Sequence, residues 1–128
     1  MTNAPAQSAT SNWKAIALLK GRDDMPREEV IAYYESNHVP LILSLFPQIR
    51  TYRRNFADFT SAYVYEDAAP FDFDIVTEII FESREAYEAM AALSADPEIA
   101  DRIARDEENF LDRGKTRMFV VQEHESRR

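Results

Sequence analysis

The sequence predicts an α+β domain with the ferredoxin-like βαββαβ order of elements and a four-stranded antiparallel sheet. Three observations lead to this prediction. Four segments have the residue patterns of strands, and helical patterns follow the first and the third of them. The length of 128 residues fits one domain, since domains run to ~100–200 residues. Elements in this order are typical of one sheet with its helices on one face.

The first strand and the first helix are predicted in the first third of the chain. Residues 13–20 (WKAIALLK) form a short apolar run, which is typical of an inner strand buried on both faces. Asp24 can cap the helix that follows, and Pro26 suits its first turn. Because the residue before a proline avoids helical backbone angles, Pro40 predicts that this helix ends or kinks at His38.

Two further strands are predicted in the middle of the chain. Residues 49–56 are rich in β-forming residues, and residues 74–81 (DIVTEIIF) alternate most clearly, which places Glu78 inside a mostly apolar strand. The segment 57–73 between them is too long for a hairpin turn and too aromatic for an ordinary solvated loop. We therefore expect another surface to cover its aromatic rings.

The last third of the chain is predicted to hold two helices and a strand. Ser83 can cap a helix over residues 84–93, and the pair Asp96 and Pro97 ends it. A further helix is expected over residues 98–111, with its apolar side chains facing inward. Residues 115–123 alternate as the final strand.

One domain with two short tails is expected. Residues 1–12 are small and polar and are predicted to be a disordered tail, residues 13–123 form the domain, and residues 124–128 are expected to fray. The N-terminal residues lack the basic start and the apolar stretch of a secretory signal. The longest wholly apolar run, residues 15–19, is far shorter than the ~20 residues that span a bilayer. We therefore expect a cytoplasmic protein without membrane contact.

The uncovered face of the predicted sheet indicates a homodimer. If the helices lie on one face, the other face still carries apolar residues such as Val76 and Ile80. A domain of this size has no further element to cover them. Pairing of two such faces closes a barrel-like cavity and makes a dimeric α+β barrel.

The composition excludes several kinds of chemistry. The net charge of -8 disfavours nucleic acid as a partner, because a polyanion binds to cations. The absence of cysteine removes thiol nucleophiles and thiolate metal sites, and two glycines are too few for a phosphate-binding loop. Neither a DxDxDG loop nor an HExxH motif is present, and haem would depend on His38 as a single histidine ligand. We therefore expect neither a cofactor nor a metal.

His38 is the first candidate for a catalytic role. An imidazole takes and gives protons near neutral pH, and the other histidine, His124, lies in the predicted C-terminal tail. The alternative is that His38 only caps the end of the helix. Tyr34 lies one helical turn before His38 and can orient the imidazole or donate to an oxyanion, or it can be an ordinary core residue.

The second group of candidates is acidic. Asp74 and Glu78 belong to the third predicted strand, where a buried carboxylate needs a partner or must be protonated. Either of them can position His38 or act as a second acid or base if it faces a cavity. The alternative for Glu78 is a structural ion pair with an arginine across the sheet. Asp106 and Glu107 are expected to be solvent-facing or salt-bridged.

Three segments carry a family resemblance. They are KAIALLKGRDDMPREEVIAYYESNHVPLI, FDIVTEIIF and DEENFLD. In this order they resemble the first strand and helix with its His-x-Pro end, the third strand, and the acidic and aromatic run before the last strand of the EthD-like family of dimeric α+β barrel proteins. The resemblance covers residues 13–123. Ile75 stands where relatives often have a small residue, and the aromatic insertion 59–73 is long, so we expect a different pocket entrance.

The resemblance implies a homodimer in which each subunit holds an apolar cavity between its own sheet and helices. Relatives in the wider superfamily include lactone isomerases, polyketide cyclases and dehydratases, cofactor-independent oxygenases and haem-handling enzymes. The fold by itself therefore does not select a reaction.

The residues and the resemblance together favour a cofactor-independent lyase or isomerase. It would promote elimination, isomerisation or cyclisation of a hydrophobic, aromatic small molecule by general acid/base proton transfer, with His38 oriented by Tyr34 and by Asp74 or Glu78. The expected substrate-binding residues are Phe59, Tyr63, Tyr65, Phe73, Arg54 and Phe110. Two alternatives stay open: a cofactor-free monooxygenase acting on a phenol or an anthrone, and a non-catalytic ligand-binding accessory protein.

Overall fold

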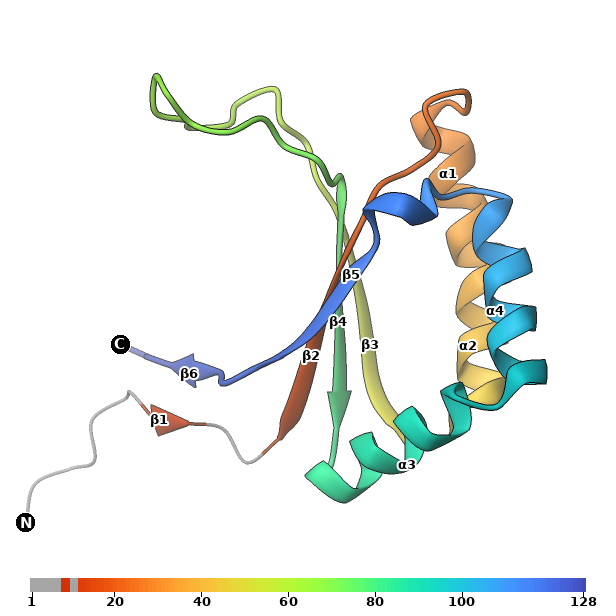
Figure 1. Ribbon diagram of the computed structural model, residues 1–128. Coiled ribbons are helices and arrows are strands. Elements are labelled where there is room, and N and C mark those ends of the chain that lie inside the picture. The colour runs from red at the N-terminus through yellow and green to blue at the C-terminus, as the bar shows by residue number, and fades with distance from the viewer. Residues whose placement is uncertain (1–7, 10–11) are drawn as a thin grey trace, which may run out of the picture.

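The computed structural model describes residues 8–9 and 12–128, and its main part is a four-stranded antiparallel sheet with helices on one face (Figure 1). The strands of this sheet are β2 (Trp13–Leu19), β3 (Ile49–Phe56), β4 (Ile75–Phe81) and β5 (Arg117–Val121). They lie in the order β3-β4-β2-β5, and every neighbouring pair is antiparallel. The predicted ferredoxin-like α+β fold is therefore confirmed, with β2 and β4 at the centre of the sheet.

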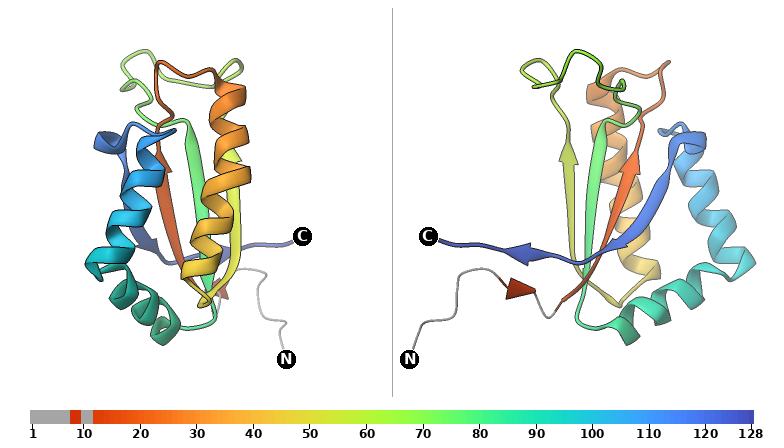
Figure 2. Two further views of the ribbon diagram at one scale, coloured as in Figure 1. Left: turned by 90° about the vertical axis from the view of Figure 1, so that its right-hand side faces the viewer. Right: turned by 60° about the vertical axis from the view of Figure 1, so that its left-hand side comes forward.

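The helical layer runs across one face of this sheet. It contains α1 (Arg27–Tyr33), the π-helical turn η1 (Tyr34–His38), α2 (Val39–Leu45), α3 (Arg84–Ser94) and α4 (Pro97–Glu108). Figure 2 shows α4 beside the long helix formed by α1, η1 and α2. The predicted cap of α3 is present, because the Ser83 hydroxyl accepts the Ala86 N–H at 3.1 Å.

The first helix does not end at the predicted place but runs on through a π turn, η1. The Val39 N–H donates to the Tyr34 carbonyl five residues earlier, and Val39 keeps helical angles although it precedes Pro40. The reason lies in the proline, which has no N–H for the carbonyl of Ser36 and crowds it with its ring. A wider turn relieves this crowding, and the π turn ends with His38, two residues before the proline.

The last helix ends earlier than predicted, at Glu108 rather than at residue 111. The chain that follows pairs with the segment after β2: the Arg22 N–H donates to the Phe110 carbonyl at 3.0 Å, and the Asp112 N–H donates to the Lys20 carbonyl at 2.8 Å. These bonds draw the backbone out of the helix and turn the Phe110 side chain into the core. The short turn η2 (Arg113–Lys115) then leads into β5.

A two-stranded ribbon stands where the sequence predicts unstructured tails. Strand β1 (Ser8–Ala9) pairs with β6 (His124–Glu125) in antiparallel register. In Figure 1 this ribbon lies beyond the sheet, on the side away from the helices. The rest of the predicted N-terminal tail, except for residue 12, lies outside the described residues.

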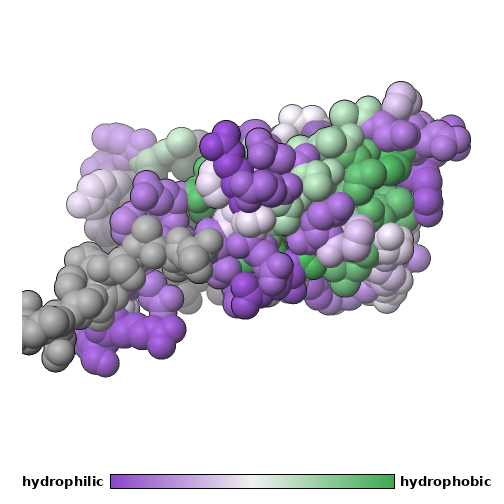
Figure 3. Space-filling view, turned by 90° about the horizontal axis from the view of Figure 1, so that it is seen from below, coloured by the Kyte–Doolittle hydropathy of each residue, from purple (hydrophilic) through white to green (hydrophobic). Residues whose placement is uncertain are grey.

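The core lies between the sheet and the helices. The inner face of β4 contributes Ile75, Thr77, Ile79 and Phe81, and the inner face of β2 contributes Ala15, Ala17 and Leu19, all of them buried. Because the alanines are short, they leave space between the middle of the sheet and the helices. Seen from below, hydrophobic residues gather toward the helical side of the molecule (Figure 3).

The other face of the sheet is open only in part, because Ile80, which was expected to lack cover, is buried at 7% exposure, whereas much of the segment 57–73 is exposed. This segment extends beyond the sheet on the side away from the helices (Figure 1). The side chains of Tyr63 and Tyr65 are 83% and 74% exposed, and Phe119 of β5 is exposed as well. The chain itself therefore does not supply the surface that we expect to cover these rings.

Candidate functional site

A cavity of about 200 Å³ lies between the sheet and the helical layer. Its wall is mainly apolar, with polar groups from Tyr34, His38, Tyr52, Thr77, Ser94, Glu107 and Thr116. The apolar lining is Ala17, Leu19, Ile42, Phe46, Ile49, Ile79, Met90, Ile103 and Met118. A few polar groups in an apolar pocket are the usual composition of a small-molecule site.

The π turn η1 places the two first candidates on the wall of this cavity. Tyr34 opens the turn and His38 closes it, and both side chains are buried, with His38 only 4% exposed. Their rings meet edge to face, with centroids 5.4 Å apart. Because a π turn widens the helix by one residue, it is a common feature of functional sites. The sequence prediction of Tyr34 and His38 as neighbours on one face is therefore confirmed.

The imidazole of His38 is held by a carboxylate from α4. The distance between His38 Nδ1 and Asp106 Oδ2 is 2.8 Å, and the other carboxylate oxygen accepts the Tyr33 hydroxyl at 2.6 Å. Asn109 donates in turn to the Tyr33 oxygen at 2.8 Å. Since an ionised carboxylate can only accept, the hydrogen lies on Nδ1. Nε2 is then the nitrogen that has no partner among the described residues, and it can take a proton.

Three hydroxyl groups form a second cluster on the cavity wall. The Tyr34 hydroxyl lies 2.7 Å from Thr77 Oγ1 and 3.0 Å from the Tyr52 hydroxyl. Burial is the main cause that raises the pKa of both Tyr34 and Tyr52, so both phenols stay protonated at neutral pH. The three hydroxyl groups have three O–H donors, and the two hydrogen bonds between them use two. One O–H is therefore available to donate a hydrogen bond to a ligand.

Arg54 supports this cluster from outside the cavity. Its guanidinium lies over the Tyr52 ring, 5.3 Å from the centroid, and pairs with Glu35 at 2.6 Å. Arg54 is therefore not among the lining residues, although the sequence predicts that it binds the substrate.

Asp74 and Glu78 do not reach His38, contrary to the prediction that one of them orients it. Glu78 lies on the sheet face away from the helices, where its carboxylate pairs with Lys14 at 2.6 Å. The prediction of a structural ion pair was right in kind, but the cation is a lysine rather than an arginine. Asp74 lies just before β4, where it accepts the Gly21 N–H at 2.9 Å and faces Lys20 at 3.5 Å.

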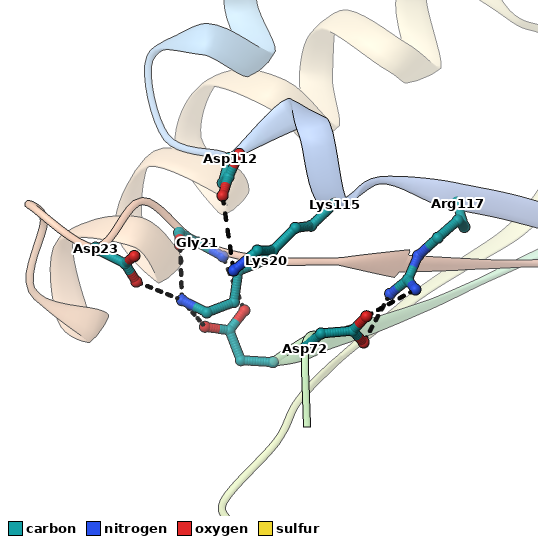
Figure 4. A network of polar contacts seen from close by, with 8 residues as sticks. Lys20, Gly21, Asp23, Asp72, Asp112, Lys115 and Arg117 are labelled. Carbon is teal, nitrogen blue, oxygen red and sulfur yellow. Dashed lines mark hydrogen bonds and ion pairs between the residues drawn. The ribbon is translucent and has the colours of Figure 1, made fainter. Parts of the chain in front are cut away.

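The surroundings of Asp74 form a polar network at the end of the sheet (Figure 4). In this network Lys20 contacts Asp23 at 2.9 Å, and Arg117 makes two 3.0 Å hydrogen bonds to Asp72. These bonds fix the end of segment 57–73 to β5. The network is structural, because each charge has a partner of opposite sign.

The predicted aromatic lining does not border the cavity. Phe59 stacks on Phe71 with a centroid distance of 4.0 Å and lines a separate surface pocket of about 380 Å³ near the start of α1. Phe73 packs edge to face on the same pair, and Tyr63 and Tyr65 are exposed. The prediction that these rings line the cavity was wrong, because the pattern of the flanking strands does not show on which side of the sheet the long segment 57–73 lies.

Phe110 has a different position from the one expected. Its ring is 0% exposed and lies 5.1 Å from the His38 ring and 5.3 Å from the Tyr34 ring, so it packs behind them. It fixes the two side chains in place. Phe110 is not among the residues that line the cavity.

The site contains residues that the sequence reasoning did not place there, namely Asp106, Glu107, Tyr33, Tyr52 and Thr77. Asp106 and Glu107 were expected to be solvent-facing or salt-bridged; Glu107 does pair with Arg113 and Asp106 with His38, but neither was expected at the cavity. Helical spacing could have found Asp106, because residues 99, 103, 106 and 110 follow the inner face at intervals of three and four, and Glu107 lies four residues after Ile103.

The described part of the chain, residues 8–9 and 12–128, has no group of three or more histidine, cysteine or acidic side chains suited to a metal ion. In the same residues no helix is long and apolar enough to cross a membrane.

Comparison with known proteins relates the chain to one family. The family model described as EthD domain matches residues 22–114. None of the curated proteins matches the chain.

Several solved structures share the fold. A dimeric protein of unknown function with a ferredoxin-like fold from Bacteroides fragilis is 14% identical, covers 91% of this chain and 100% of its own, and has a TM-score of 0.53. SnoaB, a cofactor-independent oxygenase from Streptomyces nogalater, is 8% identical over 89% and 94% of the two chains, with a TM-score of 0.52. A hydroxynitrile lyase from Passiflora edulis is 11% identical over 91% and 95%, with a TM-score of 0.52. At these identities the likeness concerns the fold alone.

Proposed function

The chain belongs to the EthD domain family, and from its cavity we propose that it is a cofactor-independent enzyme of the lyase or isomerase type. Its substrate is a hydrophobic, aromatic small molecule. The observation that carries the proposal is the buried pair of His38 and Asp106, because His38 lines an apolar cavity and Asp106 engages only its Nδ1. A histidine held by a carboxylate is an effective general base in a dry site.

The arrangement supports a simple proton-transfer cycle. His38 Nε2 takes a proton from the substrate, and the resulting imidazolium is stabilised by Asp106 at 2.8 Å. The hydroxyl group of the Tyr34, Tyr52 and Thr77 cluster that has no acceptor within the cluster donates a hydrogen bond to the substrate oxygen on which negative charge develops. The imidazolium then returns its proton to the product or to the leaving group, so that the enzyme ends in its starting state.

Two structural neighbours bear on the choice of reaction. One is described as a hydroxynitrile lyase and the other as a cofactor-independent oxygenase. Both descriptions are compatible with a cavity that supplies a base and a proton donor from its own side chains. We favour proton transfer without oxygen, because a positioned base and a donor are all that it needs.

We further propose that the protein is a homodimer, as the neighbour from Bacteroides fragilis is described to be. The exposed rings of Phe119, Tyr63 and Tyr65 support this proposal, since a second copy would bury them. Light scattering coupled to size exclusion is expected to give about 30 kDa, twice the 14.8 kDa of the chain. A mass of one chain at micromolar concentration would contradict it.

The test of the reaction compares wild-type protein with His38→Ala on a panel of aromatic cyanohydrins, phenols and anthrones. An exposed histidine supplies the matched control, His124→Ala. We expect turnover by the wild type and the control, a loss of ~10²- to 10⁴-fold in His38→Ala, and no oxygen consumption. Oxygen uptake that matches product formation would identify the oxygenase alternative, and binding without conversion would identify the accessory protein. Unchanged turnover in folded His38→Ala would remove His38 from the mechanism.

A further inference from the structure

The cavity wall holds one more ionisable group, which the mechanism above does not use. Glu107 follows Asp106 on α4 and lines the cavity, but it makes no hydrogen bond to His38. One carboxylate oxygen, Oε1, accepts the Arg113 Nε–H at 3.1 Å. The other oxygen has no donor among the described side chains, so its lone pairs are available to a ligand.

A second unsatisfied group lines the same cavity. The Thr116 hydroxyl is buried and has no hydrogen-bond partner in the described part of the chain. Buried polar atoms are nearly always paired, and an exception is a candidate for ligand contact. Glu107 lies in the last turn of α4 and Thr116 lies just before β5, whereas the hydroxyls of Tyr52 and Thr77 come from the sheet.

The charges around the cavity disfavour an anion. Arg113 is the partner of Glu107 and Glu35 is the partner of Arg54, so each of these pairs is balanced. Asp106 faces only the imidazole of His38 and the Tyr33 hydroxyl, which leaves one uncompensated negative charge when the imidazole is neutral. A second anion in an apolar cavity would meet this charge at low local dielectric.

The size of the cavity limits the ligand to about one ring. A cavity of ~150 Å³ in another protein accommodates benzene, and the cavity here measures about 200 Å³. A six-membered ring with a substituent of one to three heavy atoms therefore fits, and a fused polycyclic molecule does not fit without movement of the wall.

From these observations we propose that Glu107 is the specificity-determining residue of the cavity and selects a neutral, hydroxyl-bearing molecule with a single ring. The ligand hydroxyl donates to the free oxygen of Glu107, whereas a carboxylate or a phenolate has no proton to donate to that oxygen and meets the uncompensated charge of Asp106. This inference deepens the proposed function, because both concern one cavity, but it concerns binding and does not require turnover.

The experiment uses three probes of nearly equal shape: benzyl alcohol, toluene and benzoate. Binding is followed by methyl NMR titration of Met90, Ile103 and Met118, which line the cavity, and the methyl groups of Val30 and Ile31 report on the other pocket. In the wild type, benzyl alcohol is expected to bind ~10-fold or more tightly than toluene, as for a hydrogen bond to a charged group. Benzoate is expected to bind still more weakly than toluene.

Glu107→Gln provides the decisive comparison, and Glu108→Gln is the matched control because Glu108 is exposed on the same helix. We expect the ratio of the benzoate Kd to the benzyl alcohol Kd to fall ~10-fold or more in Glu107→Gln, and to stay unchanged in Glu108→Gln. His38→Ala is expected to keep the preference while it loses turnover, which separates this inference from the proposed function.

Three results would overturn the inference. One is equal affinity of the wild type for benzoate and benzyl alcohol, which needs no variant and so holds even if Glu107→Gln does not fold. Another is an unchanged Kd ratio in folded Glu107→Gln. The third is a shift confined to the methyl groups of Val30 and Ile31, which would place the binding in the other pocket.

Discussion

The clearest test of the site geometry is the replacement of Asp106 by alanine. In the wild type the carboxylate accepts from His38 Nδ1 at 2.8 Å, and both side chains are largely buried. A hydrogen bond to a charged group contributes ~1.5–3 kcal/mol, which corresponds to a ~10- to 150-fold preference for the Nδ1–H tautomer. Asp106→Ala removes that preference, so the neutral imidazole is expected to move toward the Nε2–H form.

The tautomers are distinguished by long-range ¹H–¹⁵N NMR of the imidazole at a pH where it is neutral. The wild type is expected to show a protonated Nδ1 and a bare Nε2. Asp101→Ala on the outer side of the same helix is the control, because Asp101 pairs only with Arg105 and is exposed. A wild-type spectrum with the proton on Nε2, or identical tautomer populations in wild type and Asp106→Ala, would refute the reasoning.

Three further predictions concern stability, each measured as the free energy of urea unfolding. Phe110→Ala is expected to lose ~3–5 kcal/mol, because it empties a fully buried site behind His38, and a loss below ~1 kcal/mol would contradict this packing. Tyr34→Phe is expected to lose ~1–3 kcal/mol by unpairing two buried hydroxyls, whereas the exposed Tyr63→Phe should be neutral. The hydrogen bond from Lys14 is the main cause that lowers the pKa of Glu78 in the folded protein. The ion pair therefore adds to the free energy of unfolding at a pH above the unfolded pKa of about 4.5, and this contribution is lost as the pH falls through the lower pKa of the folded state. Glu78→Gln should therefore flatten the fall in stability below that pH, and an equally steep fall would argue against the ion pair.

Local patterns were sufficient to predict most of the fold. Alternation placed β3 at its observed bounds and β4 within one residue, and the Ser83 cap placed the start of α3. These features depend on neighbours within a few residues, which is why the sequence reveals them. The order of strands and helices then favours the ferredoxin-like arrangement, because consecutive elements are usually neighbours joined by short connections.

The site was predicted only in part. His38 and Tyr34 lie one turn apart on one helix, so their proximity is a local property. The choice of the carboxylate that bonds to His38 is a long-range property, because it depends on how α4 packs beside η1. From the sequence, Asp74 and Glu78 were equally plausible partners of His38. In the structure, the register of β4 places Glu78 on the sheet face away from the helices, and Asp74 accepts the Gly21 N–H just after β2.

The sequence by itself determined the α+β class, the order of the elements and the histidine around which the site is built, because each follows from short-range periodicity and from a composition without cysteine. The tertiary structure alone decided that Asp106 holds the imidazole, that Glu107 and Thr116 face the cavity, and that the aromatic rings of segment 57–73 point away from it. The bond between His38 and Asp106 joins residues 68 positions apart, and the lining of the cavity depends on how α4 packs over the sheet, which no local pattern specifies.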